Sequence, residues 1–349
     1  MKMSSWIFLV ISGLLIISGL FLCNYARAKA PDDAAIDGYT TSDDGQSYTE
    51  LDYSEQRITN ITLNLKDCEV ELRGGADEAK VELIGFKPNS YIGSVTNKTI
   101  KVSNQLSFLD YFTGGSFAGV WRTLLSLTDD QTETEPEVII HIPEDQSIKQ
   151  YNLTFTNCNV SVVNITGESE INLVSTGSTV GLNKIDASLL DLTCDDTELS
   201  VLSTTADHVT CEMGGGSIIA RELVTEDIVF SGKEGEVNLI ETDFVEFEMK
   251  MTQCDLTLET VYKQGSYVRK IAIEDGEVYL GSLLLGKEDE SAEDVVAPGK
   301  ITITLEEGKV VTKYGDRQLV TEEEIPDTSE PTTAEPVTGE EAKSASEDS

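Results

Sequence analysis

The amino-acid sequence predicts an all-β protein: a single-stranded, right-handed β-solenoid with about 19 residues per coil, preceded by one hydrophobic helix and interrupted by a short amphipathic helix. Three observations predict this fold class. Apolar residues recur at an almost constant interval, each interval contains two stretches of apolar and polar alternation, and turn-forming or charged residues separate those stretches. One such segment cannot bury its apolar side alone, so successive segments are expected to stack.

The repeat is most regular between positions 151 and 265. Windows aligned on their apolar residues begin at almost equal intervals, at Tyr151, Ile171, Leu190, Val209, Ile228 and Phe247. Apolar residues fall at positions one, three, ten and twelve, and the third position holds Leu153, Leu173, Leu192, Cys211, Phe230 and Met249. Alternation with a period of two is typical of a strand with one buried face, so each window is predicted to form two short strands.

Two corners are predicted in each window. Positions six and seven hold turn formers or charged pairs such as Thr176-Gly177 and Asp195-Asp196, and a second corner follows position twelve. The eighth position is small throughout, with Cys158, Ser178, Thr197, Gly216, Gly235 and Cys254. Positions three, ten and twelve carry no charge in the six windows, which indicates a dry interior shared by neighbouring coils.

Residues 1–30 are expected to form a signal or anchor helix, because an unbroken apolar run extends from Trp6 to Cys23. The core of a signal peptide has about 7–15 residues and a membrane-spanning helix about 17–25, so the length of the run favours an anchor. Ala26 and Ala28 also form a pattern that a signal peptidase accepts. We therefore expect a single-pass anchor in the cell membrane with the bulk of the chain extracellular, or a secreted protein if cleavage follows Ala28.

Residues 31–56 are polar and are expected to be a flexible acidic linker. The solenoid domain is expected over residues 57–319. It begins with an outlying copy, at 61–72, of the twelve-position pattern of apolar and small residues, which we call the template. Residues 301–311 are expected to form a closing hairpin, and residues 320–349 a disordered acidic tail.

Residues 105–137 are expected to interrupt the solenoid as an inserted loop and helix. Apolar residues in this insertion have the spacing of a short amphipathic helix: Phe117, Val120, Trp121, Leu124 and Leu125. Two roles are open for residues 105–127. The segment covers one end of the solenoid, because repeat arrays need covered ends, or it binds a membrane surface or a partner.

Composition and chemistry limit the function classes. The formal net charge of −38 repels nucleic acid at long range, so no nucleic-acid partner is expected. The six cysteines include no Cys-x-x-Cys pair, and no metal or cofactor site is predicted. They are expected to be buried free thiols, although stacking could bring Cys194 and Cys211 close enough for a bridge. His141 and His208 are expected at the surface, and no catalytic residue is assigned.

Two stretches of the chain resemble a known family. They are Leu-Asn-Leu-Lys-Asp-Cys-Glu-Val-Glu-Leu at 63–72 and Val-Ile-Ile-His-Ile-Pro-Glu-Asp at 138–145. Together with the anchor and the repeated small-residue turn, they resemble a bacterial family of unknown function labelled putative adhesin, over about residues 58–315. The resemblance implies a membrane-anchored β-solenoid at the cell surface. It carries over no catalytic residue.

The sequence leaves more than one function open. The first is a non-enzymatic cell-envelope protein whose long faces bind a surface protein, a polysaccharide or another copy of the chain. The second is a carbohydrate-active β-helix enzyme, which needs two carboxyl groups at a set separation. A filament-forming solenoid is a third. Carboxyl groups with raised pKa values in a cleft would favour the enzyme, and a flat face without a cleft would favour the binding module.

Overall fold

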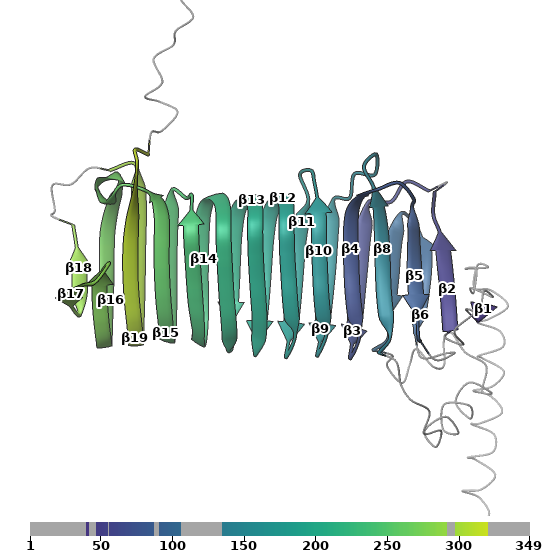
Figure 1. Cartoon of the computed structure of the whole chain (residues 1–349), viewed down its shortest axis with the longest axis horizontal. Helices are drawn as coiled ribbons and strands as arrows, with labels where there is room; N and C mark the ends of the chain where they lie inside the picture. The colour runs from purple at the N-terminus through teal and green to yellow at the C-terminus, as the bar shows by residue number, and fades with distance from the viewer. Residues whose placement is uncertain are drawn as a thin grey trace, which may run out of the picture. The chain divides into compact units, whose positions relative to one another are not determined.

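A computed structural model describes residues 40–41, 47–54, 56–86, 91–105, 135–291 and 297–319. These residues are almost entirely β-structure, assembled into one long mixed sheet of 19 strands (Figure 1). The predicted N-terminal helix, the predicted amphipathic helix and the tail 320–349 lie outside the described residues. Within those residues, no helix has the length and apolar content that crossing a membrane requires.

The strands differ in length, because some of them continue around a corner from one coil into the next. A single short 3₁₀ turn, η1 (Gln264–Ser266), accompanies the strands in the described part of the chain. The strands are β1 (Thr40–Thr41), β2 (Ser47–Asp52), β3 (Asn60–Lys66), β4 (Glu69–Ala76), β5 (Lys80–Ile84), β6 (Ile92–Thr96), β7 (Thr99–Ser103), β8 (Glu137–Pro143), β9 (Gln150–Thr156), β10 (Asn159–Ile165), β11 (Glu170–Thr176), β12 (Thr179–Asp195), β13 (Thr197–Met213), β14 (Gly216–Thr242), β15 (Glu246–Tyr262), β16 (Tyr267–Leu280), β17 (Leu283–Gly286), β18 (Glu288–Glu290) and β19 (Gly299–Arg317).

The middle of the sheet follows the sequence windows. Strands β9 and β11 to β15 pair in parallel, and the first residues of successive windows lie opposite one another, as in Leu190 beside Val209 and Val209 beside Ile228. Chain order and spatial order are therefore the same in this region (Figure 1). Because the side chains of opposed residues point to the same side, each column of like residues forms a continuous row.

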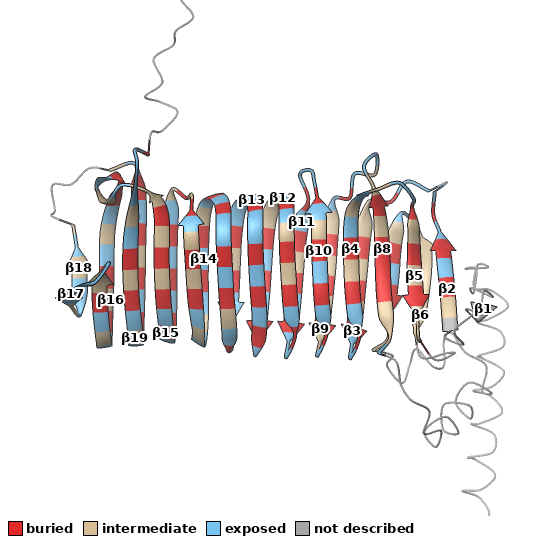
Figure 2. Ribbon diagram, viewed as in Figure 1, coloured by how far each residue is buried: buried red, intermediate tan, exposed pale blue. Residues whose placement is uncertain are grey.

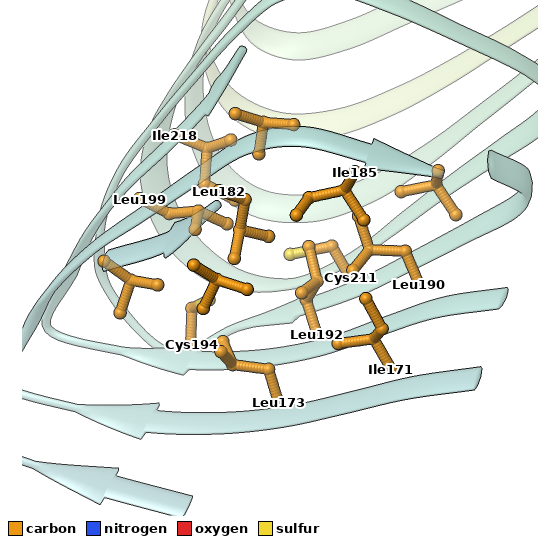
Figure 3. Close-up of a cluster of buried hydrophobic side chains, with 14 of the residues drawn as sticks. Ile171, Leu173, Leu182, Ile185, Leu190, Leu192, Cys194, Leu199, Cys211 and Ile218 are labelled. Atoms are coloured by element: carbon orange, nitrogen blue, oxygen red, sulfur yellow. The ribbon is translucent and has the colours of Figure 1, made fainter. Parts of the chain in front are cut away.

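The interior is built from the inward columns. Figure 2 shows buried and exposed residues alternating along the strands, as expected for a sheet with one dry side. Leu173, Leu192 and Leu199 are each at most 3% exposed, and Figure 3 shows them among the side chains that meet inside the coils. Burying one such side chain stabilises the fold by about 1.5–3 kcal/mol, so the columns supply most of the stabilisation.

Both predicted corners have a backbone explanation. The seventh position adopts a left-handed conformation in several coils, as at Asn157, Gly177 and Asp196, and the fourteenth position does so at Asn164, Lys184, Ser203, Glu222 and Glu241. Asn, Asp and Gly tolerate this conformation, which reverses the chain direction in one residue. Both corners of a coil are therefore formed at a residue with positive φ in several coils.

The small eighth position does more than fit the corner. The Ser178 hydroxyl donates a hydrogen bond to the Thr176 carbonyl oxygen at 3.0 Å, and the Thr197 hydroxyl donates to the Asp195 carbonyl at 3.1 Å. The Cys158 thiol makes the weaker equivalent bond to the Thr156 carbonyl at 3.4 Å. Each of these carbonyls also accepts a backbone N–H from the neighbouring coil, so a short side chain with a donor adds a second hydrogen bond at the corner.

At the N-terminal end, the chain leaves the order of the middle. Strand β3 lies between β7 and β9, and β4 lies between β8 and β10, with all of these pairs parallel. The outlying copy of the template at 61–72 is thus an inner coil of the stack. Strands β5 and β2 then extend the sheet from β8 in antiparallel fashion, and β6 pairs antiparallel with β7.

Part of the predicted flexible linker is structured. Strand β2 lies inside the range 31–56, and it pairs with β5. Leu51 and Tyr53 are 7% and 1% exposed, and the Tyr53 hydroxyl donates a hydrogen bond to the carbonyl of His141. The linker prediction is wrong for these residues because their partners come from later parts of the chain, which the local polar composition does not indicate.

At the C-terminal end, a later strand is again placed between two earlier ones. Strand β19 pairs in parallel with β15 on one side and with β16 on the other, and β17 and β18 pair antiparallel with β16. The hairpin predicted at 301–311 is wrong. Gly308 lies opposite Cys254 of β15, so the residues around it form the corner of a coil and not the turn of a hairpin.

Candidate interaction surface

The surface feature that stands out is a row of amide and hydroxyl side chains on three neighbouring strands. Strands β3, β9 and β11 pair in register, and the outward side chains between their second and sixth template positions form what we call the Asn/Thr face. Its members are Thr62, Asn64, Lys66, Asn152, Thr154, Thr156, Asn172, Val174 and Thr176. None is acidic, although the chain has 63 Asp and Glu residues.

The sequence produces this face by simple alternation. In Asn60–Lys66 the inward residues are Ile61, Leu63 and Leu65, each at most 1% exposed, and every residue between them is polar. Strand β9 repeats the pattern with Tyr151 and two further buried residues inside. Threonine suits the outward positions because its branched side chain packs well on a pleated surface.

Most side chains of the Asn/Thr face are half-buried, and few of their polar groups are hydrogen-bonded to other described side chains. The Asn172 amide Nδ2 donates to Asn152 Oδ1 at 3.4 Å, and Gln105 donates to the Thr156 hydroxyl at 3.3 Å. The hydroxyls of Thr62, Thr154 and Thr176 make no side-chain hydrogen bond with any described residue. A row of partly exposed donors and acceptors at the strand spacing, about 4.8 Å, therefore lies on this side of the coils, although Asn64 Oδ1 is buried.

The same outward columns become acidic further along the stack. Asp191 and Asp195 of β12, Glu212 of β13 and Glu248 of β15 occupy positions equivalent to residues of the Asn/Thr face. The absence of acidic residues from the Asn/Thr face is thus local to the N-terminal half, and it sets this region apart on a strongly acidic protein.

One described carboxyl group, that of Glu137, has a pKa raised above its ordinary value. Partial burial and the neighbouring Glu69 and Glu71 raise the pKa of Glu137, while Arg73 opposes the shift. Glu137 lies on strand β8, opposite Glu69. One surface hollow holds Glu226, Asp227 and Glu248 together with Lys300, but it is open to solvent. This hollow, like four others lined by described residues, does not enclose a pair of carboxyl groups away from solvent.

The two histidines lie apart and are not linked to a nucleophile. His141 is more buried than predicted, because β5 pairs alongside β8; its side chain is 16% exposed and Nε2 lies 3.7 Å from Glu82 Oε2. His208 is exposed as predicted and its Nδ1 is hydrogen-bonded to Asp227, which raises the pKa of His208. No group of three or more His, Cys, Asp or Glu in the described part of the chain is placed to hold a metal ion.

The described cysteines are buried free thiols, as predicted. Cys194 and Cys211 both lie in the interior (Figure 3), where each thiol shifts the pKa of the other, lowering that of Cys194 and raising that of Cys211. A second close pair, Cys68 and Cys158, has its sulfur atoms 3.7 Å apart.

Sequence reasoning missed both the Asn/Thr face and the second thiol pair. The alternating Asn and Thr residues of 60–66 and 150–156 were a visible signal, but the two stretches lie far apart in the chain. Only the pairing of β3 with β9 makes them one surface.

Comparisons with known proteins give one family and several solved structures. The sequence profile of the Toastrack DUF4097 family, a domain of unknown function, matches residues 58–329. No curated protein matches the chain. Two crystal structures described as putative adhesins are similar. That from Parabacteroides distasonis has 13% identity, covers 77% of this chain and 96% of its own, and has a TM-score of 0.46. That from Parabacteroides merdae has 12% identity, covers 77% of this chain and 95% of its own, and has a TM-score of 0.41.

A third similar crystal structure is described as a putative lipid binding protein, also from Parabacteroides distasonis. It has 13% identity and a TM-score of 0.38, and the match covers 79% of this chain and 97% of that one.

Proposed function

We propose that this chain, which belongs to the Toastrack DUF4097 family, is a non-enzymatic interaction module of the cell envelope. The observation that carries the proposal is the continuous outer surface of the stack, on which ordered rows of side chains are exposed without an enclosed cleft. We further propose that the domain is a right-handed solenoid with about 19 residues per coil. Parallel registers that place Ile171 opposite Leu190, Leu190 opposite Val209 and Val209 opposite Ile228 support that coil size.

The module is anchored in the membrane by residues 1–30 and is displayed outside the cell. The apolar run from Trp6 to Cys23 supports this placement, since it is long enough for a spanning helix, which needs about 17–25 residues. A net charge of −38 keeps the displayed domain soluble and keeps it away from anionic polymers.

The Asn/Thr face is the contact surface, and its partner is an uncharged polysaccharide. Amides and hydroxyls both donate and accept hydrogen bonds, which matches the hydroxyl groups of a sugar chain. Acidic residues flank the region further along the stack but are absent from the Asn/Thr face, so a neutral polymer meets no repulsion there. The regular strand spacing offers equivalent contacts to successive sugar units.

This function is preferred to a carbohydrate-active enzyme on chemical grounds. Glycoside cleavage requires an acid and a second carboxylate across the scissile bond. Glu137, the described carboxyl group with a raised pKa, has two further glutamates and Arg73 near it and pairs on strand β8 with Glu69, not with a carboxylate across a cleft. Binding through an exposed face requires no such pair.

Two experiments test the proposal. Intact cells that express the full chain are treated with protease, and immunoblotting is expected to show degradation of the domain while a cytoplasmic protein survives. Survival on intact cells, with degradation after lysis, would place the domain inside and contradict the display outside the cell.

The second experiment measures binding of the same cells to an immobilised neutral glucan and to an anionic polysaccharide. Thr154→Arg on the Asn/Thr face is expected to reduce binding to the glucan. Thr257→Arg is the matched control, since Thr257 lies opposite Asn238 and Val311 on a different side of the coils. Equal loss in both variants, or binding only to the anionic polymer, would argue against the Asn/Thr face.

A filament-forming role is the alternative, and one observation favours it. Edge strand β17 exposes Leu283, Leu284 and Leu285 by 61%, 50% and 37%. An uncharged apolar edge strand is suited to pair with the same strand of a second copy. Sedimentation of the full chain in detergent as a function of concentration separates the two roles, since Leu284→Lys would prevent assembly and leave glucan binding intact.

A further inference from the structure

Two cysteines that are far apart in the sequence meet at one corner of the stack. Cys68 and Cys158 both occupy the eighth template position, in the coils formed by β3–β4 and β9–β10. The residues on either side of them pair in register, as Lys66 does with Thr156 and Glu69 with Asn159. Their sulfur atoms are 3.7 Å apart, which is van der Waals contact.

The backbone geometry suits a covalent bond between them. Neighbouring strands lie about 4.8 Å apart, and the Cα atoms of a disulfide are usually about 4.4–6.8 Å apart. Closing the gap between the sulfur atoms therefore needs side-chain rotation and little movement of the backbone.

The corner also gives the pair a route to a reagent. Both side chains are largely buried, with 5% and 4% exposure, but Asp67 and Asn157 beside them are exposed. A hydrogen bond from the Cys68 thiol stabilises the Cys158 thiolate and lowers the pKa of Cys158, while that bond and burial raise the pKa of Cys68. Because the thiolate is the attacking species, Cys158 is the nucleophile of the pair.

We propose that Cys68 and Cys158 form a reversible disulfide that fastens the β3–β4 coil to the β9–β10 coil. The Cys158 thiolate attacks a small disulfide or a disulfide oxidoreductase, one thiolate leaves, and a mixed disulfide forms. The Cys68 thiol then loses its proton, displaces the second thiolate and completes the S–S bond. Two thiol groups lose two protons and two electrons, and the external disulfide is reduced to two thiols.

The bond would link two adjacent coils that are far apart in the sequence. It would close the long loop between Cys68 and Cys158, and linking residues far apart in the sequence restricts the unfolded chain most strongly. Strands β3 and β9 also carry most of the Asn/Thr face, so the same bond would hold that face in register. The inference rests on the sulfur geometry and does not depend on the proposed function.

The molecule contains its own control. Cys254 occupies the same column, but its neighbours in the adjacent strands are Gly235 and Gly308, so it has no partner thiol among the described residues. Burial raises the pKa of Cys254 to about 12, which makes it unreactive. Cys194 and Cys211 lie in the interior, at 0% and 2% exposure, and are less accessible than the corner pair.

The test uses the full chain, purified under reducing conditions in detergent and equilibrated with oxidised glutathione. Peptide mapping is expected to identify a Cys68–Cys158 cross-linked peptide with the loss of two hydrogen atoms. The melting temperature is expected to rise by several degrees, and dithiothreitol should reverse both changes. Mapping also separates this bond from any bond that involves Cys23.

Cys68→Ser should fold, because Ser178 fills the same column, and it should abolish both the cross-linked peptide and the stabilisation. Cys254→Ser should leave both unchanged. The proposal is overturned if Cys68 and Cys158 remain free thiols under conditions that oxidise the denatured chain, or if another pair of cysteines is linked instead. It is also overturned if the shift in melting temperature persists in Cys68→Ser.

Discussion

In the middle of the stack, from β11 to β14, each coil packs against the coils that come before and after it in the sequence, whereas towards both ends this order is broken. The inner coil β3–β4 is followed in the chain by the outer strands β7 and β8, and β19 is inserted between β15 and β16 after β16 has formed the outer coil. In both places the outermost coil is an internal segment of the chain.

The two regions are also stabilised differently. The middle depends on aliphatic columns such as Leu173 and Leu192, which need no particular partner. The C-terminal end uses an aromatic group around Tyr267, whose ring lies 5.2 Å from Phe244 and whose hydroxyl donates to the Phe244 carbonyl at 3.0 Å. Specific contacts are needed at the C-terminal end because, among the described residues, only the short strands β17 and β18 and no further full coil lie beside β16.

The largest effect is expected from breaking an inward column in the middle. Leu192→Asp places a carboxylate among Leu173, Cys211 and other buried side chains, with no cation near it in the described structure. The unpaired buried charge should cost several kcal/mol, enough to abolish the cooperative melt and the β-sheet signal in far-UV circular dichroism.

The neighbouring substitution Thr193→Asp is the control for this experiment, since Thr193 points outward and is exposed. It should still melt cooperatively, close to the wild type. A Leu192→Asp protein that keeps the parent's spectrum and melting temperature would show that the columns do not carry the stability of the middle.

A smaller and more local effect is expected at the C-terminal end. Arg269 on β16 forms an ion pair with Asp289 on β18, with Nε and Oδ2 3.0 Å apart and side chains 13% and 12% exposed. Asp289→Ala leaves the guanidinium without its partner, which should lower the free energy of local opening by roughly 3 kcal/mol. Hydrogen exchange should accelerate in β16, with no change in β12 and β13.

Glu288→Ala is the matched control, because Glu288 lies on the same strand but is exposed. It should leave exchange in β16 unchanged. If Asp289→Ala accelerated exchange equally in the middle and at the end, the two regions would unfold as one unit and the contrast between them would fail.

The contrast also explains what the sequence could predict. The middle was predictable because every coil repeats the same columns, whereas the stretches that resemble the family, 63–72 and 138–145, lie at the N-terminal end. The path of the chain at the ends was not predictable, because the corner of a coil and the turn of a hairpin use the same types of residue. Glu307 and Gly308 look like a hairpin turn, but they lie opposite Gln253 and Cys254 at a corner.

The candidate site was less predictable than the fold for a related reason. Alternation indicated that Thr62 and Thr154 point outward, but it did not indicate that they belong to adjacent strands. Sequence periodicity gives the direction of a side chain, whereas the neighbours of a coil depend on the path of the whole chain. The N-terminal helix and the inserted helix remain predictions, since they lie outside the described residues.

The smallest effect is expected at a corner in the middle, where a substitution should stabilise the fold and not destabilise it. At the N-terminal end the second corner uses Gly75 with φ of 71°, but in the middle Lys184 adopts φ of 54°. In this conformation a residue with a Cβ atom strains the folded state by about 1–2 kcal/mol. Glycine avoids the strain, but its greater freedom in the unfolded chain lowers stability by about 0.5–1 kcal/mol. Lys184→Gly should therefore stabilise the fold by about 0.5 kcal/mol, seen as a higher urea midpoint with an unchanged m-value. Lys184→Ala keeps the Cβ atom, so its urea midpoint should not rise. A higher midpoint in both variants, or a lower midpoint in the glycine variant, would mean that the corners of the middle are not strained.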